Sequence, residues 1–546
     1  MTDDMAARTR DWALALTAQP SVTGTAQEAA FGPWLADRLR AAGTFGAAGA
    51  FGAAGAFGAA EIWTFPVADG DARHCVAMLL RASGPDTVIL TGHYDTVTCD
   101  DYGDLAPLAL TPHALSEALL RRLALAASPA DRLARADLAS GAFLPGRGLL
   151  DMKAGLAAGL AVAEDFAARP GATGNLLFLA VPDEEATSAG ARAAAAALNR
   201  IAAARGLKMV AAINLDAIAD TGDGSAGRAI ALGTVGKVLP TAFVAGVPTH
   251  SGFPYNGVNA AVLLAAICAR VEWAEELTDD TAGQPGTPPS LLSMKDGKAG
   301  YDVTTPATGF AAWNVLFHRR SPEQILTAFE GLCRAAVDDC MGDLLSRARR
   351  HRLPGGTTLP MVQVARFDAV LASARARGDI DAKLAALSAA LSQTPLSLPE
   401  RCGRATALVW QESGLPGPAV VVGFGSIPYL ATHLSATAAA LRLEQAVREV
   451  AAEAGSVAVT EYFAGISDIS FFGEAAESAL DTVAANTPLW GTAIRWPTGG
   501  ALAQIPTVNI GPWGRDYHTP LERLHVDYAW GVLPGLIRGV VERVLR

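Results

Sequence analysis

The segment Asn175–Gly190, NLLFLAVPDEEATSAG, joins an apolar run to two adjacent glutamates and then to an alanine-rich stretch. The run at 175–181 lacks polar alternation, which is typical of a strand buried on both faces of a sheet. Glu184 and Glu185 therefore come just after a buried strand, where two like charges repel unless something holds them. The segment predicts an α/β sheet with a charged site at one edge.

Other parts of the chain repeat this pattern of buried strand and alanine-rich helix. Further apolar runs predict strands at 86–92, 210–216, 418–424 and 505–511. Segments 151–169 and 190–205 predict the helices between them. Because strands and helices alternate, we expect an α/β domain with a mostly parallel sheet and helices on both faces.

A block at 232–366 has a different order of elements. Strands are predicted in LPTAFVAG, SLLSMKDG, FAAWNVLFHRR and TLPMVQVARF, with helices from about Gly257 to Glu275 and from Pro322. This order is βαββαβ, which indicates an inserted α+β domain. The predicted organisation is a main domain formed by 1–231 and 367–546, interrupted by this insert.

Two segments are not assigned to this scheme. Residues 368–415 are expected to be helical and loop-rich. Within 41–60, phenylalanines recur every six residues among glycine and alanine, at Phe45, Phe51 and Phe57. Three such short units are too few for a solenoid, so we expect this repeat to lengthen a surface loop.

Composition limits the possible partners. The 546-residue chain has a net charge of −11, which makes nucleic acid and anionic membrane surfaces poor partners. The N-terminal residues, MTDDMAARTRDWALALTAQP, lack the pattern of a signal peptide. The six cysteines contain no CxxC pair, as expected for reduced thiols. These features predict a cytoplasmic protein.

Acidic and imidazole side chains cluster where the predicted strands end. In an open α/β sheet, ligands bind outside the carboxyl ends of the strands. Taken singly, an aspartate such as Asp151 or Asp216 is more typical of a helix cap, and a His-x-Asp pair of a turn. Taken together, the groups indicate a metal site. They are His93, Asp95, Asp151, Glu184, Glu185, Asp216 and His518.

The two adjacent glutamates suit a metal-dependent hydrolase. A carboxylate bound to a cation is a poor base, so a second, free carboxylate is needed to take a proton from water. We assign Glu185 as the ligand and Glu184 as the general base. Asp95 lies two residues from His93, so it is expected to accept a hydrogen bond from one ring nitrogen while the other binds metal.

Six ordered motifs resemble those of the M20 family of co-catalytic metallopeptidases and deacylases, across 20–260 and 460–530. They are TGHYDTV, GRGLLDMKAG, VPDEEATSAG, INLDA, GVPTHSGFPYNGVNA and IGPWGRDYHTPLE. The chain length, GHYDTV and FAGISDISFFG are more similar to the arginine-utilisation (RocB-type) branch. The helical stretch at about 108–138 is longer than typical relatives carry.

The resemblance implies a dinuclear centre and a non-proline cis peptide bond at Asp151–Met152. One metal would be held by Asp151, Glu185 and His518, and the other by His93, Asp151 and Asp216, with Asp151 as the bridge. Five ligands serve two metals with three each when one acid bridges. A nitrogen and oxygen ligand set without thiolate suits zinc, with cobalt or manganese as alternatives.

In the family, the inserted domain is a lid and dimerisation domain, which implies a homodimer. His250 of the HSG motif would then reach a neighbouring subunit's active site and polarise the scissile carbonyl. The alternative is an ordinary turn histidine. Asn314 and Arg319 or Arg320 are candidates for binding a substrate carboxylate, although an arginine at a strand end is more often simply solvated.

The resulting hypothesis is a hydrolase that cleaves an amide bond in a small N-acyl amino acid or short peptide, in arginine or amino-acid catabolism. A water bridging two metal ions attacks the carbonyl, with Glu184 as general base. The alternatives are a dipeptidase or carboxypeptidase-type exopeptidase, and a non-catalytic binding protein on the same scaffold.

Overall fold

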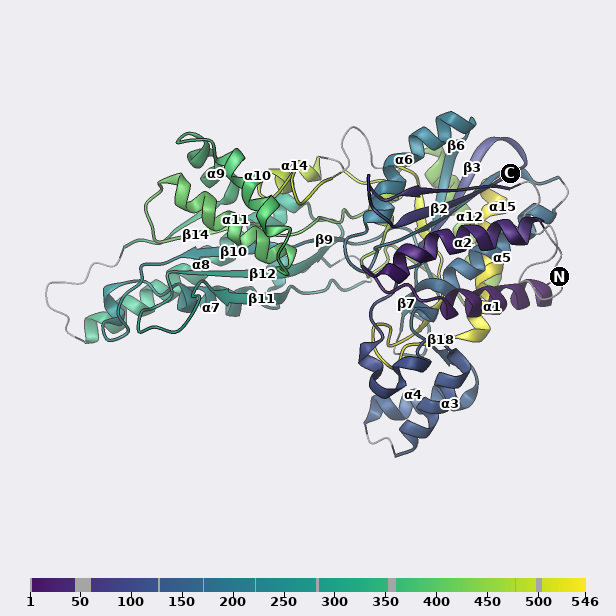
Figure 1. The fold of residues 1–546 in the computed structure, drawn as a ribbon, viewed down its shortest axis with the longest axis horizontal. Helices are drawn as coiled ribbons and strands as arrows, with labels where there is room; N and C mark the ends of the chain where they lie inside the picture. The colour runs from purple at the N-terminus through teal and green to yellow at the C-terminus, as the bar shows by residue number, and fades with distance from the viewer. Residues whose placement is uncertain are drawn as a thin grey trace. The chain divides into compact units, whose positions relative to one another are not determined.

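The computed structural model describes residues 2–44, 60–125, 128–169, 171–220, 222–280, 284–351, 360–476, 478–496 and 503–546. The phenylalanine repeat predicted within 41–60 lies almost entirely outside them. The chain divides into two compact units (Figure 1). Unit 1 comprises Met1–Thr234, Thr432–Ala475 and Pro497–Arg546, and unit 2 comprises Val235–Ala431 and Ala476–Trp496.

Unit 1 is built on an eight-stranded sheet whose centre is parallel. β5, β3, β6 and β16 pair in parallel in this order, β1 and β2 add antiparallel strands at one side, and β8 and β15 lie at the other. The predicted fold class is confirmed. The strands, in sheet order, are β1 (Glu61–Pro66), β2 (His74–Arg81), β5 (Thr173–Val181), β3 (Ser83–His93), β6 (Lys208–Asn214), β16 (Thr507–Asn509), β8 (Ala229–Ala231) and β15 (Ala458–Thr460).

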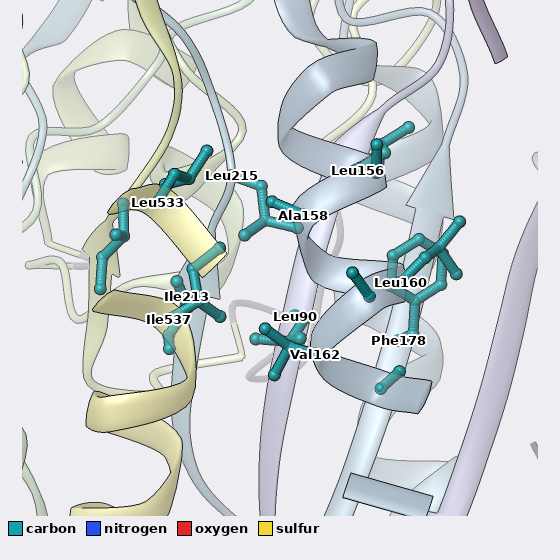
Figure 2. Close-up of a cluster of buried hydrophobic side chains, with 14 of the residues drawn as sticks. Leu90, Leu156, Ala158, Leu160, Val162, Phe178, Ile213, Leu215, Leu533 and Ile537 are labelled. Atoms are coloured by element: carbon teal, nitrogen blue, oxygen red, sulfur yellow. The ribbon is translucent and has the colours of Figure 1, made fainter. Parts of the chain in front are cut away.

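The central strands are buried on both faces, as their apolar sequences predict. Leu90 of β3, Phe178 of β5 and Ile213 of β6 contribute to one cluster with α5 and α15 (Figure 2). Burial of each such side chain contributes about 1.5–3 kcal/mol to folding. The helices of unit 1 around this sheet are α1 (Thr2–Ala18), α2 (Ala26–Thr44), α5 (Ala154–Ala168), α6 (Ala189–Arg205), α12 (Ala438–Ala454), α13 (Ile469–Phe472) and α15 (Leu533–Val544).

A helical lobe lies between β3 and β4 in the sequence, where the unusually long helical stretch was predicted. It has its own small apolar core, which includes Tyr102, Leu115, Leu119 and Leu138. Its elements are η1 (Asp100–Leu108), α3 (Pro112–Arg122), η2 (Leu123–Leu125) and α4 (Pro129–Ser140). A four-stranded sheet of order β4-β18-β17-β7 adjoins it, formed by β4 (Phe143–Pro145), β18 (Arg523–His525), β17 (Trp513–Arg515) and β7 (Ile218–Ala219).

Unit 2 contains the predicted α+β insert and two more strands, of which β9 (Gly236–Val238) pairs antiparallel with the end of β12. β10 (Pro240–Ala245), α7 (Ala260–Val271), β11 (Ser290–Asp296), β12 (Thr308–Phe317), α8 (Pro322–Arg350) and β13 (Gln363–Arg366) follow the predicted βαββαβ order. β14 (Ala419–Phe424) then enters this sheet between β10 and β13. The helices α9 (Phe367–Arg375), α10 (Ile380–Leu391) and α11 (Leu398–Ser413) also belong to unit 2, as does α14 (Ala479–Ala485).

The boundary of unit 2 therefore differs from the predicted boundary at 366. The run at 418–424 was expected to belong to the main sheet, but β14 pairs antiparallel with β10 and parallel with β13. A central strand of either sheet is buried on both faces, so its apolar sequence does not identify its neighbours. Among the described residues, no helix has both the length and the apolar composition needed to cross a bilayer.

Candidate metal centre

The parallel strands of unit 1 end at a common edge. His93, the last residue of β3, is in register with Val181, the last residue of β5. Asn214, the last residue of β6, is in register with Thr91 of β3 and Asn509 of β16. Because the strands run in parallel, the residues that follow them leave the sheet side by side.

Two histidines and three carboxylates meet at this edge. His93 Nε2 lies 3.2 Å from Asp151 Oδ1 and 3.8 Å from Asp216 Oδ1. His518 Nε2 lies 3.2 Å from Asp151 Oδ2 and 3.0 Å from Glu185 Oε2. Asp151 thus lies between the two imidazoles, in the position that a bridging ligand requires.

The predicted ligands form two groups whose donor atoms lie within 4.8 Å of one another. One contains His93, Asp151 and Asp216, and the other Asp151, Glu185 and His518. A third group, His93 with Glu184 and Glu185, overlaps both. The two sets implied by the resemblance are therefore compact in space, and Glu184 lies beside them, with its Oε2 3.9 Å from His93 Nε2.

The turn that carries the two glutamates is held by Asp95. The backbone N–H of Glu184 donates to Asp95 Oδ1 at 3.1 Å, and that of Glu185 donates to Asp95 Oδ2 at 3.2 Å. The Asp95 side chain is fully buried, and its Oδ1 lies 3.6 Å from His93 Nδ1, which is closer to the Asp95 backbone carbonyl at 3.1 Å. Asp95 therefore orients the glutamate turn as well as the His93 ring.

Asp183 and Gly190 shape the same turn from the other side. Asp183 adopts a positive φ of 70°, and its carboxylate accepts hydrogen bonds from the Thr187 hydroxyl and from the Ala189 N–H. Arg73 forms an ion pair with Asp183. A Cβ on Gly190 would come within 2.4 Å of Pro182, so the close return of the chain requires glycine here.

Neighbouring strands and turns fix the other two carboxylates. The Asn509 side chain of β16 accepts from the Asp216 N–H at 3.2 Å and donates to the Asp216 carbonyl at 2.8 Å. The peptide bond Asp151–Met152 is cis, as predicted. Glu522, fully buried, accepts from the Asp151 N–H at 3.5 Å.

The electrostatics of the cluster favour the binding of cations. Burial raises the pKa values of Glu184, Glu185 and Asp216, and neighbouring acids raise them further. Hydrogen bonds to Asp151 and Glu185 raise the pKa of His518 to about 10. Burial alone would raise the pKa of Asp151, but the two imidazoles outweigh it and hold this pKa below its usual range. Carboxylates this close together repel one another when ionised, and bound cations would neutralise that repulsion.

The nature and spacing of these donors fit divalent metal ions. Carboxylate oxygens and imidazole nitrogens, without thiolate, are ligands that zinc, cobalt and manganese accept. Each group of three leaves room in a coordination shell for water or substrate. The described residues thus contain two candidate metal sites that share one carboxylate.

Asp468 was not among the site residues predicted from the sequence, although it lies in the motif FAGISDISFFG. Asp468 is 1% exposed, and burial raises its pKa to about 7 although His93 and Ser188 oppose the shift. Neither of its oxygens has a hydrogen bond of good geometry to a donor among the described residues. The signal available in the sequence was a single acid inside a largely apolar segment.

The predicted substrate residues belong to unit 2. His250 is exposed, and its Nδ1 accepts from the Gly252 N–H at 3.0 Å, as in an ordinary turn. Asn314 is half-buried on β12, opposite Ser290 of β11. Arg319 is exposed just after β12, and its N–H donates to Asp279 Oδ2 at 2.7 Å. These contacts all lie within unit 2, so the roles of His250, Asn314 and Arg319 in substrate binding remain predictions.

Known proteins of similar sequence cover most of this chain. It is 28% identical to the uncharacterized protein YqjN of Bacillus subtilis (strain 168) over 494 residues, which are 89% of each chain. It is also 28% identical to Protein RocB of the same organism over 478 residues, covering 84% of this chain and 82% of RocB.

Solved structures of similar fold include two peptidases. A tripeptidase from Staphylococcus aureus matches with a TM-score of 0.53 and 16% identity, over 99% of both chains. The aminopeptidase PepT from Bacillus cereus matches with a TM-score of 0.53 and 14% identity, also over 99% of both chains. The model of peptidase family M20/M25/M40 matches residues 135–486, which is more than half of the chain. This chain belongs to peptidase family M20/M25/M40.

Proposed function

We propose that the protein is a metal-dependent hydrolase that cleaves an amide bond in a small N-acyl amino acid or short peptide. One observation carries the proposal: two groups of three ligands share Asp151, and the free carboxylate of Glu184 lies next to them. A pair of cations accounts for the two ligand groups, and a general base that takes a proton from water accounts for the carboxylate of Glu184.

His93, Asp151 and Asp216 would hold one cation, and Asp151, Glu185 and His518 the other. This division uses all five predicted ligands and leaves Glu184 free, whereas a set of His93, Glu184 and Glu185 would leave Asp216 without a role. We expect zinc, with cobalt or manganese as alternatives. The bound cations would supply Lewis-acid chemistry, which acidifies water and polarises a carbonyl group.

Glu184 carries the proton in this scheme. Its buried carboxylate takes a proton from the attacking water at one Oε atom, and then delivers it to the nitrogen of the leaving amine. Burial raises the pKa of Glu184, which makes it a stronger base than an exposed glutamate. Asp95 supports this step because it fixes the backbone N–H of Glu184.

Residues of unit 2 are proposed to recognise the substrate. His250 would polarise the scissile carbonyl from a neighbouring subunit, and Asn314 with Arg319 would bind a substrate carboxylate. This assignment requires a homodimer formed through unit 2. The exposed apolar side chains of unit 2, Leu292 and Met294 on β11 and Val262 on α7, support such an interface. A chain that sediments as a monomer at micromolar concentration would contradict it.

The proposed substrate class rests on the resemblance of the motifs to the arginine-utilisation (RocB-type) branch, and the 28% identity to Protein RocB over most of both chains supports that resemblance. We therefore propose a cytoplasmic role in arginine or amino-acid catabolism, and acyl-arginine compounds are the first substrates to test. The alternatives are an exopeptidase, which would prefer dipeptides with a free terminus, and a binding protein without turnover. A panel of N-acyl amino acids and dipeptides with added zinc or cobalt distinguishes the three.

Glu184→Gln tests the proposal. The change keeps the shape of the side chain and removes the base, so kcat should fall at least about 100-fold while metal content stays at the wild-type level. Glu185→Gln is the matched control because it replaces a predicted ligand one residue away and should lower metal content. Turnover by Glu184→Gln at the wild-type rate would refute the role of Glu184.

A further inference from the structure

The helical lobe, residues 98–142, is tied to the loop that carries His518. This loop, residues 516–522, joins β17 to β18, and β18 pairs with β4 at the end of the lobe (Figure 1). Leu521 of the loop packs against the apolar core of the lobe. The lobe and the loop are therefore neighbours in unit 1, although more than 370 residues separate them in sequence.

Arg523 makes the first polar link between them. It is 1% exposed, and its Nε and Nη2 donate to Asp137 Oδ2 of α4 at 2.9 and 2.7 Å. Its Nη1 donates to Asp516 Oδ2 at 2.6 Å and to the Leu521 carbonyl at 3.0 Å. One buried guanidinium thus joins α4 to both ends of the His518 loop.

Arg147 makes the second link, which connects the lobe to Asp151 through Glu522. It is also 1% exposed, and it donates to Asp101 Oδ2 of η1 at 2.6 Å and to Glu522 Oε2 at 2.8 Å. The other oxygen of Glu522 accepts from the Asp151 N–H. The lobe is therefore connected to Asp151 through the side chains of Arg147 and Glu522. It is connected to the loop that carries His518 through the side chain of Arg523.

The loop needs such support because its backbone is unusual. Asp516 and His518 both adopt positive φ angles, 55° and 61°, a region that is uncommon for residues other than glycine. Such a conformation persists only where surrounding contacts hold it. A buried guanidinium is itself costly without its carboxylate partners, so each arginine stabilises one arrangement of lobe and loop.

We propose that the helical lobe is a positioning element for the candidate metal centre, with Asp137 holding the His518 loop through Arg523 and Asp101 holding Asp151 through Arg147 and Glu522. Asp137 is a positioning residue, since it contacts neither the predicted ligands nor substrate. The inference rests on the ligand set of the proposed function.

Asp137→Asn tests the inference because it removes the charge that Arg523 pairs with and keeps the size of the side chain. Arg523 retains Asp516 as a partner, so the chain is expected to fold. Removing support of this kind should weaken zinc binding at the site that contains His518 by about tenfold or more, measured by competition with a chromophoric chelator. Asp104→Asn is the matched control, because Asp104 pairs with Arg122 within the lobe, and among the described residues no hydrogen bond or ion pair joins it to the loop. It should leave zinc affinity unchanged.

A second comparison separates positioning from general destabilisation. If Asp137 acts through His518, Asp137→Asn should have no further effect on zinc affinity in a His518→Ala background. Equal weakening in both backgrounds, or wild-type affinity of Asp137→Asn, would overturn the inference. Unchanged metal stoichiometry of His518→Ala would instead overturn the ligand set itself. Should Asp137→Asn fail to fold, Arg523→Lys, which keeps one charge but cannot reach Asp137 and Asp516 together, replaces it in the same comparisons.

Discussion

Replacing Asp95 with asparagine should disturb both glutamates of the centre at once. The Asp95 carboxylate accepts three hydrogen bonds: from the N–H of Glu184 on Oδ1, and from the N–H of Glu185 and the hydroxyl of Thr23 on Oδ2. An asparagine has one oxygen and one NH2 group in place of the two oxygens. In either orientation, the NH2 group faces a part-buried backbone N–H, which then has no acceptor.

The expected cost follows from this count. A buried donor left without a partner costs about 1–3 kcal/mol, so Asp95→Asn should lower the free energy of unfolding by at least that amount. The turn would also be released from the orientation that directs Glu184 and Glu185. Because disturbing the partners of a metal ligand typically weakens binding 10–100-fold, zinc affinity should fall in that range.

Urea denaturation followed by tryptophan fluorescence, together with chelator competition, measures both effects. Thr23→Val is the control: it removes one hydroxyl donor at 2.9 Å but leaves both glutamate N–H groups with their acceptor. Its cost should be about 1 kcal/mol, with unchanged zinc affinity. If Asp95→Asn matched Thr23→Val in stability and bound zinc as tightly as the wild type, Asp95 would not organise the turn.

Two further predictions concern the support of the sheet. Trp12→Phe removes the indole N–H that donates to the buried Glu164 at 2.7 Å. Burial raises the pKa of Glu164, and the hydrogen bond from the indole opposes this shift. Folding therefore favours the protonated acid, and the stability that Glu164 contributes is lost as the pH rises through its folded-state pKa. The loss of Tm in Trp12→Phe should therefore be larger at pH 8 than at pH 5, and a loss independent of pH would contradict this reasoning. Gly155→Ala places a Cβ 1.9 Å from the Leu215 carbonyl oxygen, next to Asp216, and should lower the free energy of unfolding by about 1–3 kcal/mol or more. Gly535→Ala is the control, because no atom lies within 4 Å of its added Cβ, and it should leave the Tm unchanged or raise it in thermal denaturation.

The fold class and the clustering of the site groups could be predicted because they depend on local patterns. Apolar runs without alternation identify buried parallel strands, and parallel strands end at one edge of a sheet. His93, Glu184, Glu185 and Asp216 could therefore be placed together before any coordinates were known. Asp151, at the start of a predicted helix, and His518, after the strand predicted at 505–511, were placed in the same set, and the family motifs then implied how the ligands divide between two metals.

Other features depended on contacts that no local pattern encodes. The apolar sequence of β14 suited either sheet, and its pairing with β10 and β13 decided that it belongs to unit 2. Asp95 was expected to serve His93, but the structure shows that its carboxylate also accepts the N–H groups of the glutamate turn. Hydrogen bonds of this kind depend on which chain segments meet.

The α/β architecture, the family and the set of carboxylates and imidazoles can be inferred from the sequence, because periodicity and motif spacing are properties of short segments. The links that two buried arginines, Arg147 and Arg523, make between the helical lobe and the Asp151 and His518 region become visible only in the folded chain. The physical reason is that a charged side chain in a sequence has no assigned partner. Its partner is chosen when burial removes water and leaves only the carboxylates that folding has brought within reach.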